Sequence, residues 1–148
     1  MSSVYELAKK FKQEYKGTVA WRLKAHSKVI EKHLNPGETV QFVFAGQKSH
    51  SPFDIFSTYV VVLTNKRILL AQKRVLFGYL YLSITPEMFN DLTLKSGLFW
   101  GTVYIDTIKE VIAISKLSKS SLPIIETQIT EYMMEEKKNY EKRNGDSE

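Results

Sequence analysis

The sequence predicts a mainly β fold with helices at both ends, in which about seven antiparallel strands form a small barrel. Three observations predict this class. Two β-rich apolar runs between 59 and 71 flank the turn residues Asn65 and Lys66, the pattern of a tight hairpin. Further short strand-like runs continue to Ile105, and the chain ends in an amphipathic helical stretch. Short strands separated by turn residues are typical of barrels and sandwiches.

The composition supports one globular domain. The chain has 148 residues, of which 43% are hydrophobic, enough for a packed core that needs no disulfide bond or bound metal. Cysteine is absent, which excludes disulfides and thiolate metal sites and fits a reducing compartment. No apolar stretch approaches the roughly 20 residues that span a bilayer. We therefore expect a cytoplasmic protein.

The net charge of +5 is distributed unevenly, and the chain divides into three regions. An N-terminal helical extension at 1–34 holds eight Lys or Arg against three Glu. A central domain at 35–134 follows, and a charged tail at 135–148 is expected to fray. A basic first region can meet an anionic surface, although a solvated helix face is the ordinary explanation.

Two helices are expected before the strands. Apolar residues recur at helical spacing over 4–16, with Ser2 or Ser3 as a cap, and again over 18–34, where Trp21 widens the apolar stripe. The sequence Asn-Pro-Gly-Glu at 35–38 then has the composition of a turn and ends the second helix.

Seven strands are expected after this turn. A polar loop should occupy 46–52, and Asn65 should adopt the left-handed backbone of a tight hairpin. Gly78 should mark a bulge inside the fourth strand. The predicted strands are 38–45, 55–64, 67–72, 75–84, 89–95, 98–106 and 108–114.

The last element is a helix that should cover an open end of the strands. Ser120 and Ser121 can cap it, and Pro123 suits its first turn because a missing N–H costs nothing there. Its apolar stripe is Leu122, Ile125, Ile129, Tyr132 and Met133.

The motifs carry a resemblance. The run Leu-Thr-Asn-Lys-Arg-Ile at 63–68, the run Phe-Asn-Asp-Leu at 89–92, and the glycines Gly97 and Gly101 resemble the bacterial PH-like domains, in particular the YokE-like or short PH proteins. The turn at 35–38 is also typical of that group. The resemblance covers about 35–134.

The resemblance implies the pleckstrin-homology superfold. In that fold two bent antiparallel sheets pack nearly at right angles, close into a shell and are plugged by the last helix. The group usually has Ile-Pro at one corner, whereas Thr85 separates Ile84 from Pro86 here. The geometry of that corner should therefore differ.

We expect no catalytic, cofactor or metal site. The histidines are His26, His33 and His50, and no carboxylate at i+4 spacing completes a zinc set on the second helix. No glycine-rich phosphate loop or nucleophile elbow occurs, although catalytic groups that meet only in space leave no such pattern. High-affinity phosphoinositide binding at the usual mouth of PH domains is not expected either, because 54–59, at the start of the second strand, begins with Asp54 and contains no base.

The predicted function is a non-enzymatic binding or assembly module, in which a protein partner or a second copy adds a strand to an open sheet edge or packs a helix. In the pair Phe99-Trp100 only one ring can face outward, and Trp100 is expected to do so. The candidate partner-binding residues are Lys48, His50, Asn65, Lys66 and Trp100.

The alternative function is a peripheral membrane module that binds anionic lipid through its basic N-terminal helices. Against it, the apolar stripe of the first helix can instead pack on the barrel or on another molecule. Nucleic-acid binding is not expected, because a row of lysines contacts phosphates without reading bases. The candidate anionic-surface residues are Lys9, Lys10, Lys12, Lys16, Lys24, Lys28 and Lys32. The identity of the partner and the oligomeric state stay open.

Overall fold

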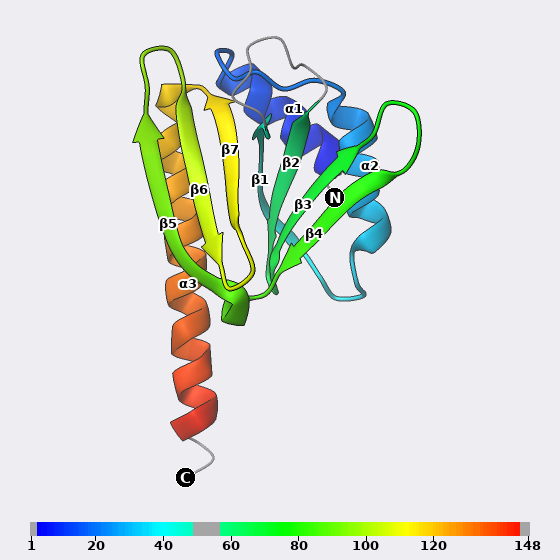
Figure 1. The fold of residues 1–148 in the computed structure, drawn as a ribbon. Coiled ribbons are helices and arrows are strands. Elements are labelled where there is room, and N and C mark those ends of the chain that lie inside the picture. Colours follow the sequence, from blue (N-terminus) through cyan, green and yellow to red (C-terminus); the bar gives the residue numbers. More distant parts are fainter. Residues whose placement is uncertain (1–2, 49–56, 146–148) are drawn as a thin grey trace.

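Seven antiparallel strands and three α-helices make up the computed structural model, which describes residues 3–48 and 57–145 (Figure 1). The predicted fold class is confirmed. The elements are α1 (Val4–Glu14), α2 (Leu23–His33), β1 (Val40–Gln47), β2 (Thr58–Thr64), β3 (Ile68–Lys73), β4 (Tyr79–Ile84), the 3-10 turn η1 (Pro86–Met88), β5 (Phe89–Ser96), β6 (Gly101–Thr107), β7 (Val111–Leu117), the 3-10 turn η2 (Lys119–Ser121) and α3 (Leu122–Gly145).

The strand order is β4-β3-β2-β1-β7-β6-β5, and neighbouring strands are antiparallel. Strands β1 and β7 are joined by the single pair Gln47 and Ser115, so the sheet consists of two halves, β1–β4 and β5–β7. Within the described residues β4 and β5 do not pair with each other. The shell that was expected to be closed is therefore an open, barrel-like sheet.

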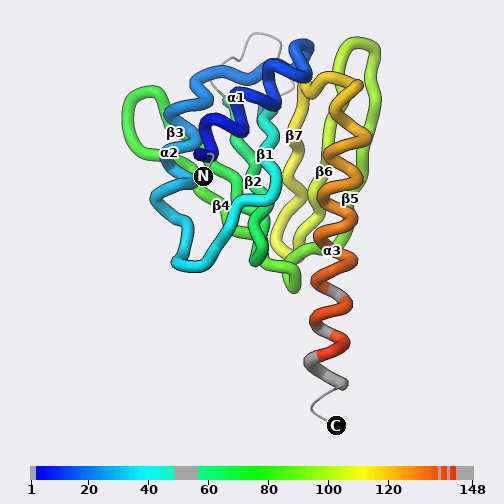
Figure 2. The backbone as a smooth tube through the Cα atoms, turned by 180° about the vertical axis from the view of Figure 1, so that it is seen from behind, coloured from blue at the N-terminus to red at the C-terminus, as the bar shows by residue number. Residues whose placement is uncertain are grey.

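Helices cover both halves of the sheet. Figure 2, seen from behind, shows α1 and α2 against β1–β3 and α3 along β5–β7. One face of β1–β3 packs on α1 and α2, and the other face lies in the main core with α3. This explains why Tyr59–Leu63 in β2 is apolar without alternation, since both of its faces are buried. The N-terminal helices thus pack on the sheet of the same molecule.

The first helix begins as predicted, but the second begins five residues late. Ser3 caps α1 by accepting a hydrogen bond from Glu6 N. The segment 18–22 is not helical. Its backbone is instead held by other elements, because Val19 N donates to Lys116 O and Trp21 N donates to the Thr58 hydroxyl. These partners lie on β7 and β2, so helical spacing along the chain could not predict them.

Two of the predicted strand boundaries are wrong at glycines. The expected polar loop at 46–52 begins too early, because Gly46 and Gln47 belong to β1. A Cβ at Gly46 would lie 2.6 Å from Ile114 Cγ2, so only glycine allows β1 to approach β7 here. The expected strand at 75–84 begins only at Tyr79, and Gly78 (φ 75°) ends a hairpin turn.

The other predicted strands are present, although β6 and β7 begin three residues later than expected. Strand β5 follows the 3-10 turn at 86–88, which forms the corner where Thr85 was noted. Helix α3 buries Ile125, Ile129 and Tyr132 in the main core, as the stripe predicted. It continues without a break from 135 to 145, where fraying was expected, and extends past the sheet (Figure 1).

Candidate functional site

Two of the motifs that carry the resemblance, the turn at 35–38 and the run at 63–68, form one charged latch. The Arg67 guanidinium donates to both carboxylate oxygens of Glu38, at 2.9 Å each, and also to the His33 carbonyl and the Ser83 hydroxyl. The Thr64 hydroxyl donates to the same carboxylate at 2.7 Å. The Glu38 side chain is 0% exposed and that of Arg67 is 16% exposed. The latch therefore joins α2, the turn at 35–38, the β2–β3 hairpin and β4.

The electrostatics of the latch follow from this geometry. The hydrogen bond from Arg67 lowers the pKa of Glu38 from 4.5 to about 2. The same bond raises the pKa of Arg67. Each charge compensates the other, so the latch stabilises the fold and leaves no charge for a partner.

Asn65 belongs to this latch as well. Its Oδ1 accepts from Thr39 N at 2.9 Å and its Nδ2 donates to Gly37 O at 3.2 Å. The expectation of a left-handed backbone at Asn65 is wrong, because the described non-glycine residues with positive φ are Arg22 and Lys116. Asn65 is required for its side-chain hydrogen bonds.

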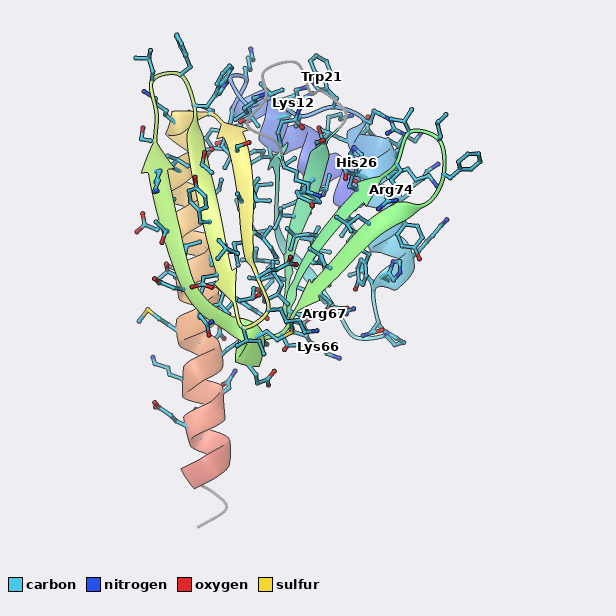
Figure 3. All side chains as sticks on the ribbon, in the orientation of Figure 1. Lys12, Trp21, His26, Lys66, Arg67 and Arg74 are labelled. Atoms are coloured by element: carbon cyan, nitrogen blue, oxygen red, sulfur yellow. The ribbon has the colours of Figure 1, made fainter. Side chains whose placement is uncertain are left out.

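The predicted partner-binding residues do not form one surface. Lys48 follows β1 at the end of the sheet where the β5–β6 hairpin lies, whereas Asn65 and the exposed Lys66 lie at the opposite end (Figure 3). His50 lies outside the described residues. These residues stay candidates for separate contacts.

The orientation predicted for Trp100 is wrong. Residues 98–100 form the β5–β6 turn, so strand alternation does not apply to them. Trp100 is half-buried and its Nε1 donates to Gly17 O at 3.0 Å, whereas Phe99 is 73% exposed. The outward ring is therefore Phe99.

The lysines of the N-terminal helices separate into two groups. On α1, Val4 and Ala8 are buried against the sheet and Phe11 reaches the main core, so that helix has no free apolar stripe for a lipid surface. Lys9, Lys10 and Lys16 are exposed around it. The Lys12 ammonium is engaged, since it donates to Ala20 O and lies 4.1 Å from the Trp21 ring centroid.

The lysines of α2 meet other bases at a pocket. Lys24, Lys28 and Lys32 line a cavity of about 510 Å³ together with Arg22 and Lys73. The spacing of Lys24, Lys28 and Lys32 in the sequence places them on one helix face. It could not show that the end of β3 lies opposite that face.

The two histidines on α2 hold the helix in place. His26 is fully buried and its Nδ1 accepts from Lys73 N at 2.7 Å. Burial, with a smaller contribution from the Arg22 charge, lowers the pKa of His26 from 6.5 to about 4. His33 stacks on Tyr81 with 3.9 Å between ring centroids. Among the described residues no group of three His, Asp or Glu could hold a metal ion.

A groove between β5 and α3 is the second cavity, with a volume of about 530 Å³. Its apolar floor consists of Phe89, Leu92, Leu94, Ile129 and Met133. Four acids line it and none of its described lining residues is basic; the acids are Glu87, Asp91, Glu126 and Glu136. Sequence reasoning did not predict this site, although the alternation within 89–95 gave a signal for it.

The edge beside the groove can accept another strand. Strand β5 is the last strand in the sheet order and pairs with β6 on one side.

The described part of the chain contains no helix that is long and apolar enough to cross a membrane.

The comparisons with known proteins concern the same region. A family model described as a bacterial PH domain matches residues 34–131 of the 148. A pleckstrin homology domain from Shewanella amazonensis SB2B, known from a crystal structure, has 17% sequence identity and a TM-score of 0.43, and the match covers 70% of this chain and 80% of that chain. A comparison with curated proteins finds no match.

Proposed function

This chain belongs to the bacterial PH domain family, as the resemblance over 35–134 predicted, and from that premise we propose that it is a non-enzymatic module that binds a protein partner at the β5–α3 groove. The single observation that carries the proposal is the position of β5, an edge strand that runs beside an apolar groove with an acidic rim.

Strand addition is the binding mode that this arrangement supports. An edge strand offers backbone N–H and C=O groups on its open side, and an extended segment can pair with them. Strand β5 provides eight residues, Phe89–Ser96, for such pairing. The backbone pairing supplies affinity, and the neighbouring groove selects the side chains.

The groove defines the chemistry of the partner. Alternate side chains of an added strand point to the same face, so every second residue would lie over the floor of Leu92, Leu94 and Met133. The acidic rim favours Lys or Arg near these apolar positions. We therefore expect a segment that combines apolar and basic residues.

The alternative function, association with an anionic membrane through the N-terminal helices, has weaker support. It needed a free apolar stripe on α1, and that stripe is buried. Its remaining support is the row of lysines on α2.

The test is selection of peptides from a random displayed library, followed by NMR mapping of a selected peptide. We expect basic and apolar residues to be enriched, and the shifted amide signals to lie in β5 and α3. Selected peptides without basic residues, or shifts confined to other elements, would contradict the proposal.

A matched pair of variants tests the acidic rim. Glu126→Lys with Glu136→Lys reverses two charges in the groove, and Glu135→Lys with Glu141→Lys reverses two on the same helix outside it. Isothermal titration should show that the first variant loses about tenfold in affinity while the second changes little. Equal losses would mean that the net charge of α3 controls binding and that the groove does not.

A further inference from the structure

We propose that the pocket between α2 and the β3–β4 hairpin binds a ligand that carries two or more phosphate groups. This site is separate from the β5–α3 groove and does not depend on it. Most of its bases precede residue 34, where the family match begins, so family membership does not supply the site.

The first observation is the density of positive charge. Five bases line the pocket and none of its described lining residues is acidic. They come from three segments: Arg22 before α2, Lys24, Lys28 and Lys32 along α2, and Lys73 at the end of β3. A charge of +5 around about 510 Å³ matches a multiply charged anion.

The second observation is that the lysines are uncompensated. Within the part of the chain that the structure describes, the side chains of Lys24, Lys28 and Lys32 make no hydrogen bond or ion pair, and all three residues are exposed. They are spaced four residues apart, and like charges at that spacing destabilise a helix. A bound polyanion would remove this repulsion.

The third observation is that the pocket wall is held rigidly. Arg22 adopts a left-handed backbone (φ 54°), and its Nη1 donates to Lys73 O at 2.9 Å. Lys73 N donates to the buried His26. These two bonds fix the start of α2 against the end of β3, so the bases on both sides keep their relative positions.

The start of α2 adds to the positive electrostatic potential of the pocket. The helix has no acidic residue in its first turn and no side-chain cap, while Lys24 and Ala25 of that turn line the pocket. The positive end of the helix dipole therefore reinforces the five side chains.

The source of the phosphates is a free molecule or a lipid headgroup, and the neighbouring hairpin allows a test of which. Between Lys73 and Tyr79 the turn presents Val75, Leu76 and Phe77, which are 55%, 83% and 85% exposed. Figure 3 shows this hairpin, with Arg74 in its turn, extending from the sheet next to α2. An apolar tip beside a basic pocket can enter a bilayer when the phosphates belong to lipids.

The first experiment is isothermal titration of the full chain with inorganic tripolyphosphate. Lys24→Gln, Lys28→Gln and Lys32→Gln together should lower the affinity by about tenfold or more. The control replaces Lys9, Lys10 and Lys16 by glutamine, which removes the same charge from exposed positions on and after α1, and it should stay within about twofold. Absence of binding to the unmodified chain, or equal losses in both variants, would overturn the proposal.

The second experiment identifies the source. Sedimentation with phosphatidylcholine vesicles, with and without cardiolipin, whose headgroup carries two phosphates, is compared for the unmodified chain and for Leu76→Ser with Phe77→Ser. A lipid source predicts that anionic vesicles bind and that this variant loses vesicle binding but keeps tripolyphosphate binding. The control, Leu98→Ser with Phe99→Ser, alters the other exposed hairpin tip.

Tripolyphosphate binding without vesicle binding supports a free phosphorylated molecule. Vesicle binding that survives the loss of the α2 lysines would overturn the pocket as the site.

Discussion

The latch at Glu38 and Arg67 and the pocket along α2 both contain several charged groups. The charges of the latch neutralise each other, whereas those of the pocket do not. In the latch one acid and one base are buried together, and four further polar groups complete their hydrogen bonding. In the pocket five bases face a cavity whose described lining contains no acid.

The comparison teaches that a basic residue in a recognisable motif is not thereby a binding residue. The Thr-Asn-Lys-Arg hairpin looks like an exposed basic corner in the sequence, yet the charge of Arg67 is neutralised by its ion pair with Glu38. Lysines on α2 belong to no motif and remain uncompensated within the described residues. Charges that the fold has not neutralised are the ones available to a ligand.

Breaking the latch should have the largest effect. Glu38→Ala leaves the Arg67 guanidinium without its partner in a mostly buried site, which costs about 3–5 kcal/mol. Urea unfolding measures this free energy, and Lys66→Ala, at the exposed neighbour, should change it little. The double variant Glu38→Leu with Arg67→Met should recover part of the loss, because no charge is then left unpaired. A loss below about 1 kcal/mol for Glu38→Ala would place the latch among ordinary surface ion pairs.

Acid should release the same latch without a mutation. The folded-state pKa of Glu38 is depressed from 4.5 to about 2, so its contribution is complete above pH 4.5 and is lost as the pH falls toward 2. The shift corresponds to about 3 kcal/mol. Unfolding free energies measured across this range should fall more steeply for the unmodified chain than for Glu38→Gln. Parallel pH profiles would contradict the assignment.

His26 gives the α2 side a pH dependence in a higher window. Its folded-state pKa is lowered to about 4, so the unfolded chain takes up a proton first and stability falls as the pH drops from 6.5 toward 4. The total loss is about 3 kcal/mol at most. His26→Asn retains an acceptor for Lys73 N but does not titrate, so its stability should fall less between these pH values than that of the unmodified chain. An unchanged slope in thermal or urea unfolding would show that another group is responsible.

Neutralising the pocket should have the smallest effect on stability and the opposite sign. The glutamine variant of Lys24, Lys28 and Lys32 removes two like-charge pairs at i,i+4 spacing, each worth about 0.2–0.5 kcal/mol. Its free energy of unfolding should therefore rise by about half a kcal/mol at low salt, and added salt should remove the difference. A clear decrease would mean that these lysines stabilise the fold.

Much of the fold could be predicted from the sequence because the signals are local. Seven strand patterns, the turn at 35–38 and the stripe of α3 depend on the spacing of apolar residues and on turn composition. The errors arose where distant partners decide. The segment 18–22 is not helical because β7 and β2 supply hydrogen bonds to it, and Trp100 is half-buried because Gly17 accepts from its ring.

By itself the sequence determined the fold class, the family and the amphipathic stripes, since periodicity and turn chemistry act between neighbours in the chain. Only the tertiary structure decided which charges are neutralised inside the fold and which remain available to a ligand. Glu38 and Arg67 are 29 residues apart, and Lys28 and Lys73 are farther apart still. Whether two charges so distant in the chain neutralise each other or share a pocket depends on how the sheet brings them together.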